Sequence, residues 1–146
     1  MEGLLLLNKA AGRTSFSLVS LLRRMTDIRK IGHAGILDPF ATGLMLMLIG
    51  KNYTKKAEQL LNLEKEYLAH VHLGKTTATF DPEGAILTTS PAIPSLEEIK
   101  NVLTAFEGEI LQVPPMFSAK KVNGQKLYHL ARQGKTIERA PVLVKV

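Results

Sequence analysis

The sequence predicts a mixed α/β fold, because short apolar runs typical of strands alternate with segments that carry the spacing and caps of helices. Gly3–Leu7 and Leu44–Ile49 are apolar without alternation, as strands covered on both faces are, although six residues do not exclude a buried helix at Leu44–Ile49. Between these runs, residues 14–26 have the periodicity of an amphipathic helix. With 146 residues and no internal repeat, the chain is expected to form a single domain, residues 1–146.

The first strand is expected to end at a turn over residues 11–13, where Gly12 allows the chain to reverse. Thr14 or Ser15 then offers an N-cap for a helix that runs to about Thr26. After Leu44–Ile49, residues 51–61 are expected to be helical. The predicted apolar face of the first helix consists of Phe16, Val19, Leu22 and Met25.

Residues 65–73 alternate between apolar and polar side chains, which predicts a strand that places Tyr67 on its apolar face. Residues 74–90 are rich in turn formers. Ser95 and Glu98 have the spacing of a capping box, and the helix that follows is expected to reach about Phe106. The remaining expected elements are a strand at Ile110–Val113, a helix at Lys126–Arg132 ended by Gly134, and a strand at Val142–Val146.

The net charge of +6 is divided into blocks along the chain. Residues 1–56 carry nine Lys/Arg and three Asp/Glu, residues 57–109 carry three and nine, and residues 110–146 carry seven and one. Two basic ends on one face would form the positive footprint that a phosphate backbone requires, whereas separate placement would make them ordinary solvated surface.

The composition excludes several classes of protein and of binding site. Because the chain has no cysteine, disulfides and thiolate metal sites are excluded. Its apolar runs are too short to span a bilayer or to act as a signal sequence, so no membrane association and a cytoplasmic location are expected. Two weak motifs, Ser118-x-x-Lys121 and His70-x-His72, lack the accompanying residues that an acyl-enzyme or a metal site needs.

Residues 32–43, GHAGILDPFATG, place one carboxylate in a loop with little conformational freedom. Its three glycines permit backbone angles that other residues disfavour, and Pro39 restricts both itself and Asp38. A structural turn and a functional site are both compatible with this spacing alone.

This segment resembles the signature loop of the TruB family of tRNA pseudouridine synthases, Gly-His-x-Gly-x-Leu-Asp-Pro-x-Ala-x-Gly, and matches each of its fixed positions. Residues 4–15 are similar to the opening strand and first motif of that family, with Ala10 in place of the usual proline and Asn8 in place of a frequent aspartate. Residues 113–134 are similar to its RNA-contacting segment.

The resemblance implies the pseudouridine synthase catalytic fold, a mixed and largely antiparallel sheet flanked by helices. It also implies that the protein isomerises the T-loop uridine at position 55 of tRNA, without metal or cofactor. The expected partner is the T-arm stem-loop of tRNA, and the full-length protein is expected to be a monomer. A non-catalytic RNA-binding or RNA-folding module remains the alternative.

By resemblance, Asp38 is the catalytic residue, acting as a nucleophile or as the base that removes a ribose proton. Tyr67 would pack on the flipped base, and His33 would insert into the RNA where that base had been stacked. Lys9 would support the active-site loop or meet a phosphate. On the residues alone, a core side chain on the apolar strand face is the favoured interpretation of Tyr67, and an ordinary loop histidine is the alternative for His33.

The resemblance further implies a thumb-like RNA-binding segment at about residues 113–140. Its expected RNA contacts are Lys120, Lys121, Lys126 and Arg132, accompanied by Asn123 and Gln125. The family's later arginine motif and its C-terminal RNA-binding domain are absent from the sequence. The chain is therefore expected to be the N-terminal portion of a catalytic domain, with little or no activity alone.

Overall fold

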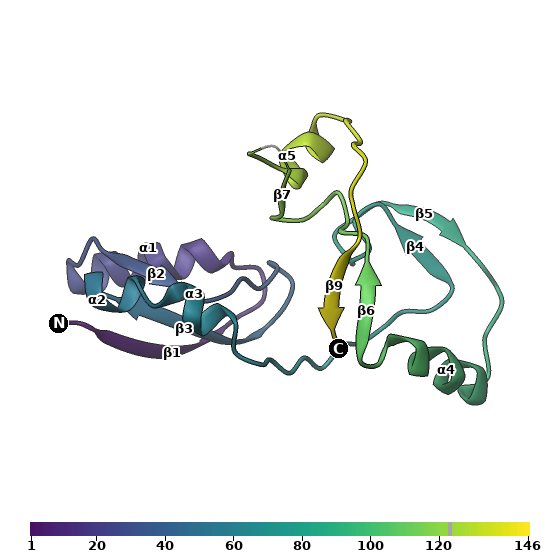
Figure 1. Ribbon diagram of the computed structural model, residues 1–146, viewed down its shortest axis with the longest axis horizontal. Helices are drawn as coiled ribbons and strands as arrows, with labels where there is room; N and C mark the ends of the chain where they lie inside the picture. The colour runs from purple at the N-terminus through teal and green to yellow at the C-terminus, as the bar shows by residue number, and fades with distance from the viewer. Residues whose placement is uncertain (123) are drawn as a thin grey trace. The chain divides into compact units, whose positions relative to one another are not determined.

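The computed structural model describes residues 1–122 and 124–146. Backbone contacts divide the chain into two compact units, Met1–Val71 and His72–Val146. The expectation of one catalytic domain over the whole chain stays a prediction. The expected mixed α/β class is confirmed, since both units combine helices with antiparallel strands (Figure 1).

The first unit is built on a three-stranded antiparallel sheet in the order β1-β3-β2. Its strands are β1 (Gly3–Lys9), β2 (Ile31–His33) and β3 (Gly43–Ile49). The register pairs Gly3 with Ile49 and Lys9 with Gly43. The loop after β1 and the loop before β3 therefore emerge at the same end of the sheet.

Helix α1 (Ser15–Thr26) forms as the sequence predicts, with the Thr14 hydroxyl accepting a hydrogen bond from Ser17 N at 3.1 Å. The predicted apolar face is only partly right, because Phe16 and Met25 remain 60% and 73% exposed. The side chains that α1 buries are Ser15, Leu18, Val19 and Leu22. These four lie at i, i+3, i+4 and i+7, which centres the buried face between the two exposed residues.

The core of the first unit lies between α1 and the sheet. Met45, Met47 and Ile49 of β3 pack there with Ile31 of β2 and the buried residues of α1. Met47 and Leu48 are both fully buried, so β3 is covered on both faces at that point, as expected. Strand β1 differs from its expected burial on both faces, because its alternate residues Leu4 and Leu6 are exposed.

Two predicted elements of the first half differ from the structure. The helix expected over residues 51–61 is split into α2 (Lys51–Thr54) and α3 (Ala57–Leu61). The strand expected over residues 65–73 is wrong, because this segment pairs with no other strand in the described part of the chain. All of its residues are exposed, as are residues 61–64 before it. Alternation determines which side chains share a face, but a strand also needs a hydrogen-bonding neighbour, and the described residues provide none here.

The second unit contains three two-stranded antiparallel sheets. The turn-rich segment after Gly74 contains the pair β4 (Lys75–Thr77) and β5 (Ile86–Thr89). Helix α4 (Leu96–Leu103) begins with the predicted capping box and continues into the 3₁₀ turn η1 (Thr104–Phe106).

Strands β6 (Glu109–Gln112) and β9 (Val142–Lys145) pair with each other, as Figure 1 shows. The chain between them contains the small hairpin of β7 (Lys121–Val122) and β8 (Gln125–Lys126), followed by α5 (Leu127–Arg132). Residues 113–140 are therefore an excursion from a strand pair, and we refer to them as the thumb-like segment.

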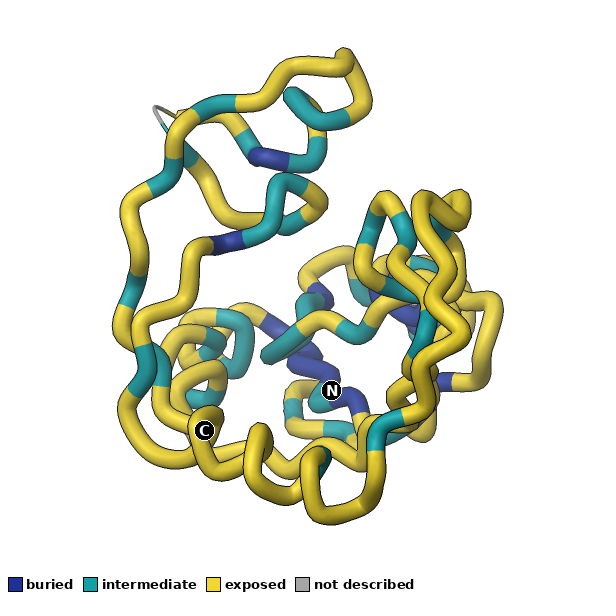
Figure 2. The backbone as a smooth tube through the Cα atoms, turned by 90° about the vertical axis from the view of Figure 1, so that its right-hand side faces the viewer, coloured by how far each residue is buried: buried dark blue, intermediate teal, exposed yellow. Residues whose placement is uncertain are grey.

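The two units differ in how much they bury. Buried residues, dark blue in Figure 2, are concentrated in the first unit, whereas among the described residues of the second unit only Pro114 and Leu127 are buried. No helix in the described part of the chain is long and apolar enough to cross a membrane.

Candidate active site and nucleic-acid interface

Asp38 lies in the loop between β2 and β3, at the end of the first sheet. Its backbone carbonyl accepts a hydrogen bond from Ala41 N at 3.1 Å, which closes a tight turn. Gly35 and Gly43 flank this turn with φ values of 115° and 135°, angles that only glycine adopts without strain. The side chain of Asp38 is exposed, so the carboxylate is available to a partner from outside the chain.

The residue before Asp38 is tied to helix α1. The hydroxyl of Ser15 accepts a hydrogen bond from Leu37 N at 3.0 Å and lies 3.1 Å from Leu37 O, to which it donates. Ser15 is 5% exposed, so these bonds are largely shielded from water. One side chain thus uses both its donor and an acceptor position on a single backbone residue.

The residue after Asp38 is tied to the end of β1. Pro39 O accepts hydrogen bonds from Lys9 Nζ at 3.1 Å and from Gly12 N at 2.8 Å. Lys9 Nζ also donates to Ala10 O at 3.3 Å and to Arg13 O at 2.8 Å. The three ammonium donors of Lys9 therefore join the loop after β1 to the loop of Asp38.

The burial of Lys9 bears on its predicted role. Its side chain is 0% exposed, and its ammonium is engaged by three backbone carbonyls. A cation in this position has no exposed surface to offer to a phosphate. Of the two roles considered from the sequence, the geometry favours support of the loop.

His33 is the last residue of β2 and lies opposite Met47 of β3, towards the sheet end that carries Asp38. The next residue, Ala34, continues the pairing by donating its N–H to Leu46 O at 2.9 Å. His33 Nδ1 is buried and has no hydrogen-bond partner among the described residues. The backbone of His33 is thus held in the sheet, whereas no hydrogen bond to Nδ1 within the described residues holds its ring.

Tyr67 is 67% exposed and lies in the irregular segment that follows α3. It is not a core tyrosine in this structure. No hydrogen bond or aromatic contact joins its side chain to the loop of Asp38 within the described residues. The predicted role of Tyr67, packing on the flipped base, therefore stays a prediction.

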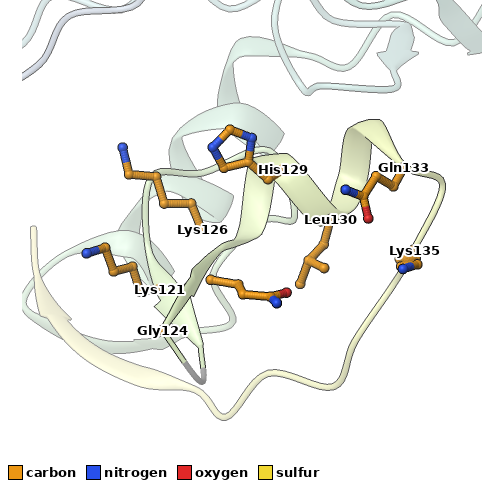
Figure 3. Close-up of a pocket in the computed structure, with 8 residues that line it drawn as sticks. Lys121, Gly124, Lys126, His129, Leu130, Gln133 and Lys135 are labelled. Atoms are coloured by element: carbon orange, nitrogen blue, oxygen red, sulfur yellow. The ribbon is translucent and has the colours of Figure 1, made fainter.

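The thumb-like segment contains a hollow of about 450 Å³. Figure 3 shows its lining, which comes from the β7–β8 hairpin, from α5 and from the turn after α5. Its cationic side chains are Lys121, Lys126 and Lys135, and the neutral polar groups include His129 and Gln133. A hollow with this lining suits an anion with several hydrogen-bond acceptors.

The cations in this hollow are held close together by the fold. Lys121 and Lys126 are directly opposite each other in the hairpin, an arrangement of like charges that disfavours pairing in the absence of a counter-ion. Lys126 Nζ and Arg132 Cζ lie 5.4 and 5.5 Å from the ring centroid of Tyr128, within the range of cation–π attraction. The ring of Tyr128 thus holds Lys126 and Arg132, two of the predicted RNA-contacting residues, near each other.

The four predicted RNA contacts are not all at one place. Lys121 and Lys126 line the hollow, and Arg132 is placed beside it by Tyr128. Lys120 instead lines a separate apolar hollow with Val122 and Leu127. Asn123 lies outside the described residues.

Sequence reasoning missed Lys135, although a signal for it was present. Gly134 has φ 71° and donates its N–H to Ala131 O at 2.9 Å, while Lys135 N donates to Leu130 O at 3.0 Å. This pair of bonds is a Schellman motif, which a glycine directly after a helix predicts. The motif folds Lys135 back against α5, where it joins the hollow.

The alternative motifs gain no support. The hydroxyl of Ser118 is buried without a hydrogen-bond partner in the described part of the chain, so no contact with Lys121 activates it. His70 and His72 are exposed. Among residues 1–122 and 124–146, no group of three or more His, Asp or Glu side chains is close enough to hold a metal ion.

Comparisons with known proteins agree on one family. A family model described as TruB family pseudouridylate synthase, N-terminal domain, matches residues 23–146. The tRNA pseudouridine synthase B of Protochlamydia amoebophila is 56% identical over 146 residues, covering 100% of this chain and 56% of that protein. Proteins of the same name from Chlamydia muridarum and Opitutus terrae are 54% and 45% identical, and in each case the match covers 100% of this chain and 61% of the relative.

The chain thus spans between 56% and 61% of the length of these curated relatives. Among solved structures, a chain in the crystal structure of a Cbf5-Nop10-Gar1 complex matches with a TM-score of 0.56 and 26% sequence identity. That match covers 82% of this chain and 31% of the other.

Proposed function

This chain belongs to the TruB family of pseudouridylate synthases, and on that premise we propose that it forms pseudouridine in tRNA, with Asp38 as the catalytic carboxylate. The proposed target is the T-loop uridine at position 55, in the T-arm stem-loop. The proposed setting is the cytoplasm, and the proposed full-length protein is a monomer. Relatives named for tRNA pseudouridine synthesis support the substrate class.

One observation carries this proposal: Asp38 is exposed, while the residues on both sides of it are anchored. Leu37 is held by Ser15, and Pro39 is held by Lys9 and Gly12. A loop that only reversed the chain would not need anchors on both neighbours of one exposed acid. Fixing a reactive group before the substrate arrives lowers the entropic part of the barrier.

The proposed reaction is an isomerisation, so it needs no co-reactant. The N1–C1′ bond of uridine breaks, the uracil turns, and a C5–C1′ bond forms. The proton on C5 is lost, and N1 carries a proton in the product. Asp38 serves as the nucleophile, or as the base that removes a ribose proton in the glycal route, and both roles need an ionised carboxylate beside the sugar.

The uridine must leave its stack before an exposed carboxylate can reach the glycosidic bond. We assign Tyr67 to the flipped base, because the residue is 67% exposed and its ring can be covered by a planar partner. We assign His33 to the RNA, at the position that the base vacates. Lys9 is assigned to the support of the Asp38 loop rather than to contact with substrate.

The thumb-like segment is proposed to bind RNA phosphates. Three lysines line its hollow, and two of them face each other across the β7–β8 hairpin. A phosphate between Lys121 and Lys126 would remove their mutual repulsion. Arg132 is proposed to contact the same backbone, and Lys120 is proposed as a more peripheral RNA contact.

The test uses residues 1–146 joined in place of the aligned N-terminal part of the Protochlamydia amoebophila relative, a protein we call the fusion. The fusion is incubated with a T-arm stem-loop, and pseudouridine is mapped by nucleotide. We expect a single pseudouridine at the T-loop position and none when that uridine is replaced by cytidine. A fusion that binds the stem-loop but forms no pseudouridine would instead identify these residues as a non-catalytic RNA-binding module.

A further inference from the structure

We propose that Ser15 is a positioning residue for Asp38, acting through the backbone of Leu37. This inference rests on the proposed function of Asp38. The Ser15 hydroxyl contacts Leu37 N at 3.0 Å and Leu37 O at 3.1 Å, and no other side chain hydrogen bond reaches Leu37 within the described residues. Met45 Sδ lies 3.8 Å from the same hydroxyl oxygen, within the core of the first unit.

The hydrogen bond to Leu37 O acts on the peptide group that leads into Asp38, and the bond from Leu37 N acts on the peptide group before it. Leu37 O and Asp38 N belong to the same planar unit, so holding the oxygen also fixes the plane that enters Asp38. On the other side, Pro39 has a restricted φ, and its carbonyl oxygen is held by Lys9 and Gly12. The backbone of Asp38 is therefore held on both sides, and its side-chain torsions are the main freedom that remains.

Ser15 is suited to this role because its own position is fixed. It is the first residue of α1, whose N-terminus is capped by Thr14. The helix is in turn anchored in the core by Leu18, Val19 and Leu22. The hydroxyl thus connects a packed helix to the reactive loop, and a shift of the loop would require breaking bonds that are shielded from solvent.

The same helix offers a matched control. The Ser17 hydroxyl donates to Thr14 O at 2.7 Å and makes no contact with the Asp38 loop among the described residues. Ser17→Ala therefore removes a hydroxyl from the same turn of α1 without releasing Leu37. Ser15→Thr keeps a hydroxyl at the position under test.

The experiment measures kcat and KM for the stem-loop with the fusion and its Ser15→Ala, Ser15→Thr, Ser17→Ala and Asp38→Asn variants. We expect Ser15→Ala to lower kcat on the order of 10- to 100-fold, the scale of a misplaced catalytic group, with KM changed less than about twofold. Ser15→Thr should recover most of the loss, and Ser17→Ala should match the parent. In residues 1–146, Ser15→Ala should also speed amide hydrogen exchange at Leu37 more than at Ile31 in the adjacent sheet.

The outcomes separate this inference from the function on which it rests. If Asp38→Asn abolishes turnover while Ser15→Ala keeps the parental kcat, the Ser15 inference is refuted and the proposed function stands. If Asp38→Asn retains turnover, the proposed function itself fails. Should Ser15→Ala lose its cooperative melting transition, Ser15→Cys replaces it, because a thiol has a similar shape and is a weaker hydrogen-bonding group. A parental kcat in that variant would overturn the inference.

Discussion

Removing the three lysines of the thumb-like hollow should flatten the salt dependence of RNA binding. The perturbation combines Lys121→Ala, Lys126→Ala and Lys135→Ala, which are the cationic residues that line the hollow. Each phosphate contact releases about 0.7 to 0.9 of a counter-ion, so loss of three contacts should reduce the slope of log K against log salt by about 2.1 to 2.7. Between about 50 and 200 mM salt, the parent should therefore lose roughly 20- to 40-fold more affinity than the variant.

Fluorescence anisotropy with a labelled T-arm stem-loop measures this slope in both residues 1–146 and the fusion. The matched control replaces Lys75, Lys100 and Lys145 by alanine, because these exposed lysines belong to the same unit and lie outside the hollow. The control has the same change in net charge, and its slope should stay close to that of the parent. Equal slopes for the two triple variants would refute the assignment of the hollow to phosphate, because net charge alone would then explain the effect.

Two further predictions concern stability. Lys9→Met should lower the free energy of unfolding by about 1.5 to 3 kcal/mol in urea denaturation, because the hydrogen bonds of the ammonium group are lost. Pro39 O keeps one partner, Gly12 N. An unchanged free energy of unfolding would show that the hydrogen bonds of Lys9 contribute nothing to stability. The hydrogen bond from Ser95 N, and next that from the Ser95 hydroxyl, lowers the pKa of Glu98. Its stabilising contribution is therefore present above the unfolded-state pKa and is lost as the pH falls through the lower folded-state pKa. Thermal melts at neutral and acidic pH should show a smaller pH effect for Glu98→Ala than for the parent, and identical pH effects would contradict the assignment.

Local signals predicted much of the fold. The Thr14 cap and the Ser95–Glu98 capping box each marked the start of a helix that the structure contains, and Gly134 marked the termination of another. These signals work because capping involves only residues a few positions apart. The strand expected at residues 65–73 failed for the opposite reason, since pairing depends on a partner that alternation does not specify.

In the candidate site, too, the local features were predicted from the sequence and the long-range contacts were not. The Asp38 loop was identified from a continuous motif, whereas its anchors connect residues 22 positions apart at Ser15 and Leu37 and 30 apart at Lys9 and Pro39. Such contacts follow from the β1–β3 register, which brings the two loops to one end of the sheet. Ser15 was expected only as a possible cap, and its hydroxyl instead holds the loop of Asp38 through Leu37.

The central claim is that an exposed Asp38, anchored through both neighbours, carries the chemistry. Tritium release from 5-labelled uridine in the T-arm stem-loop tests it most directly, with the fusion compared to its Asp38→Asn variant. Asparagine keeps the shape of the side chain but removes the charge and the basic oxygen. We predict that Asp38→Asn releases no measurable tritium while binding the stem-loop within a few-fold of the parent. Release at a substantial fraction of the parental rate would contradict the claim and show that another group performs the reaction.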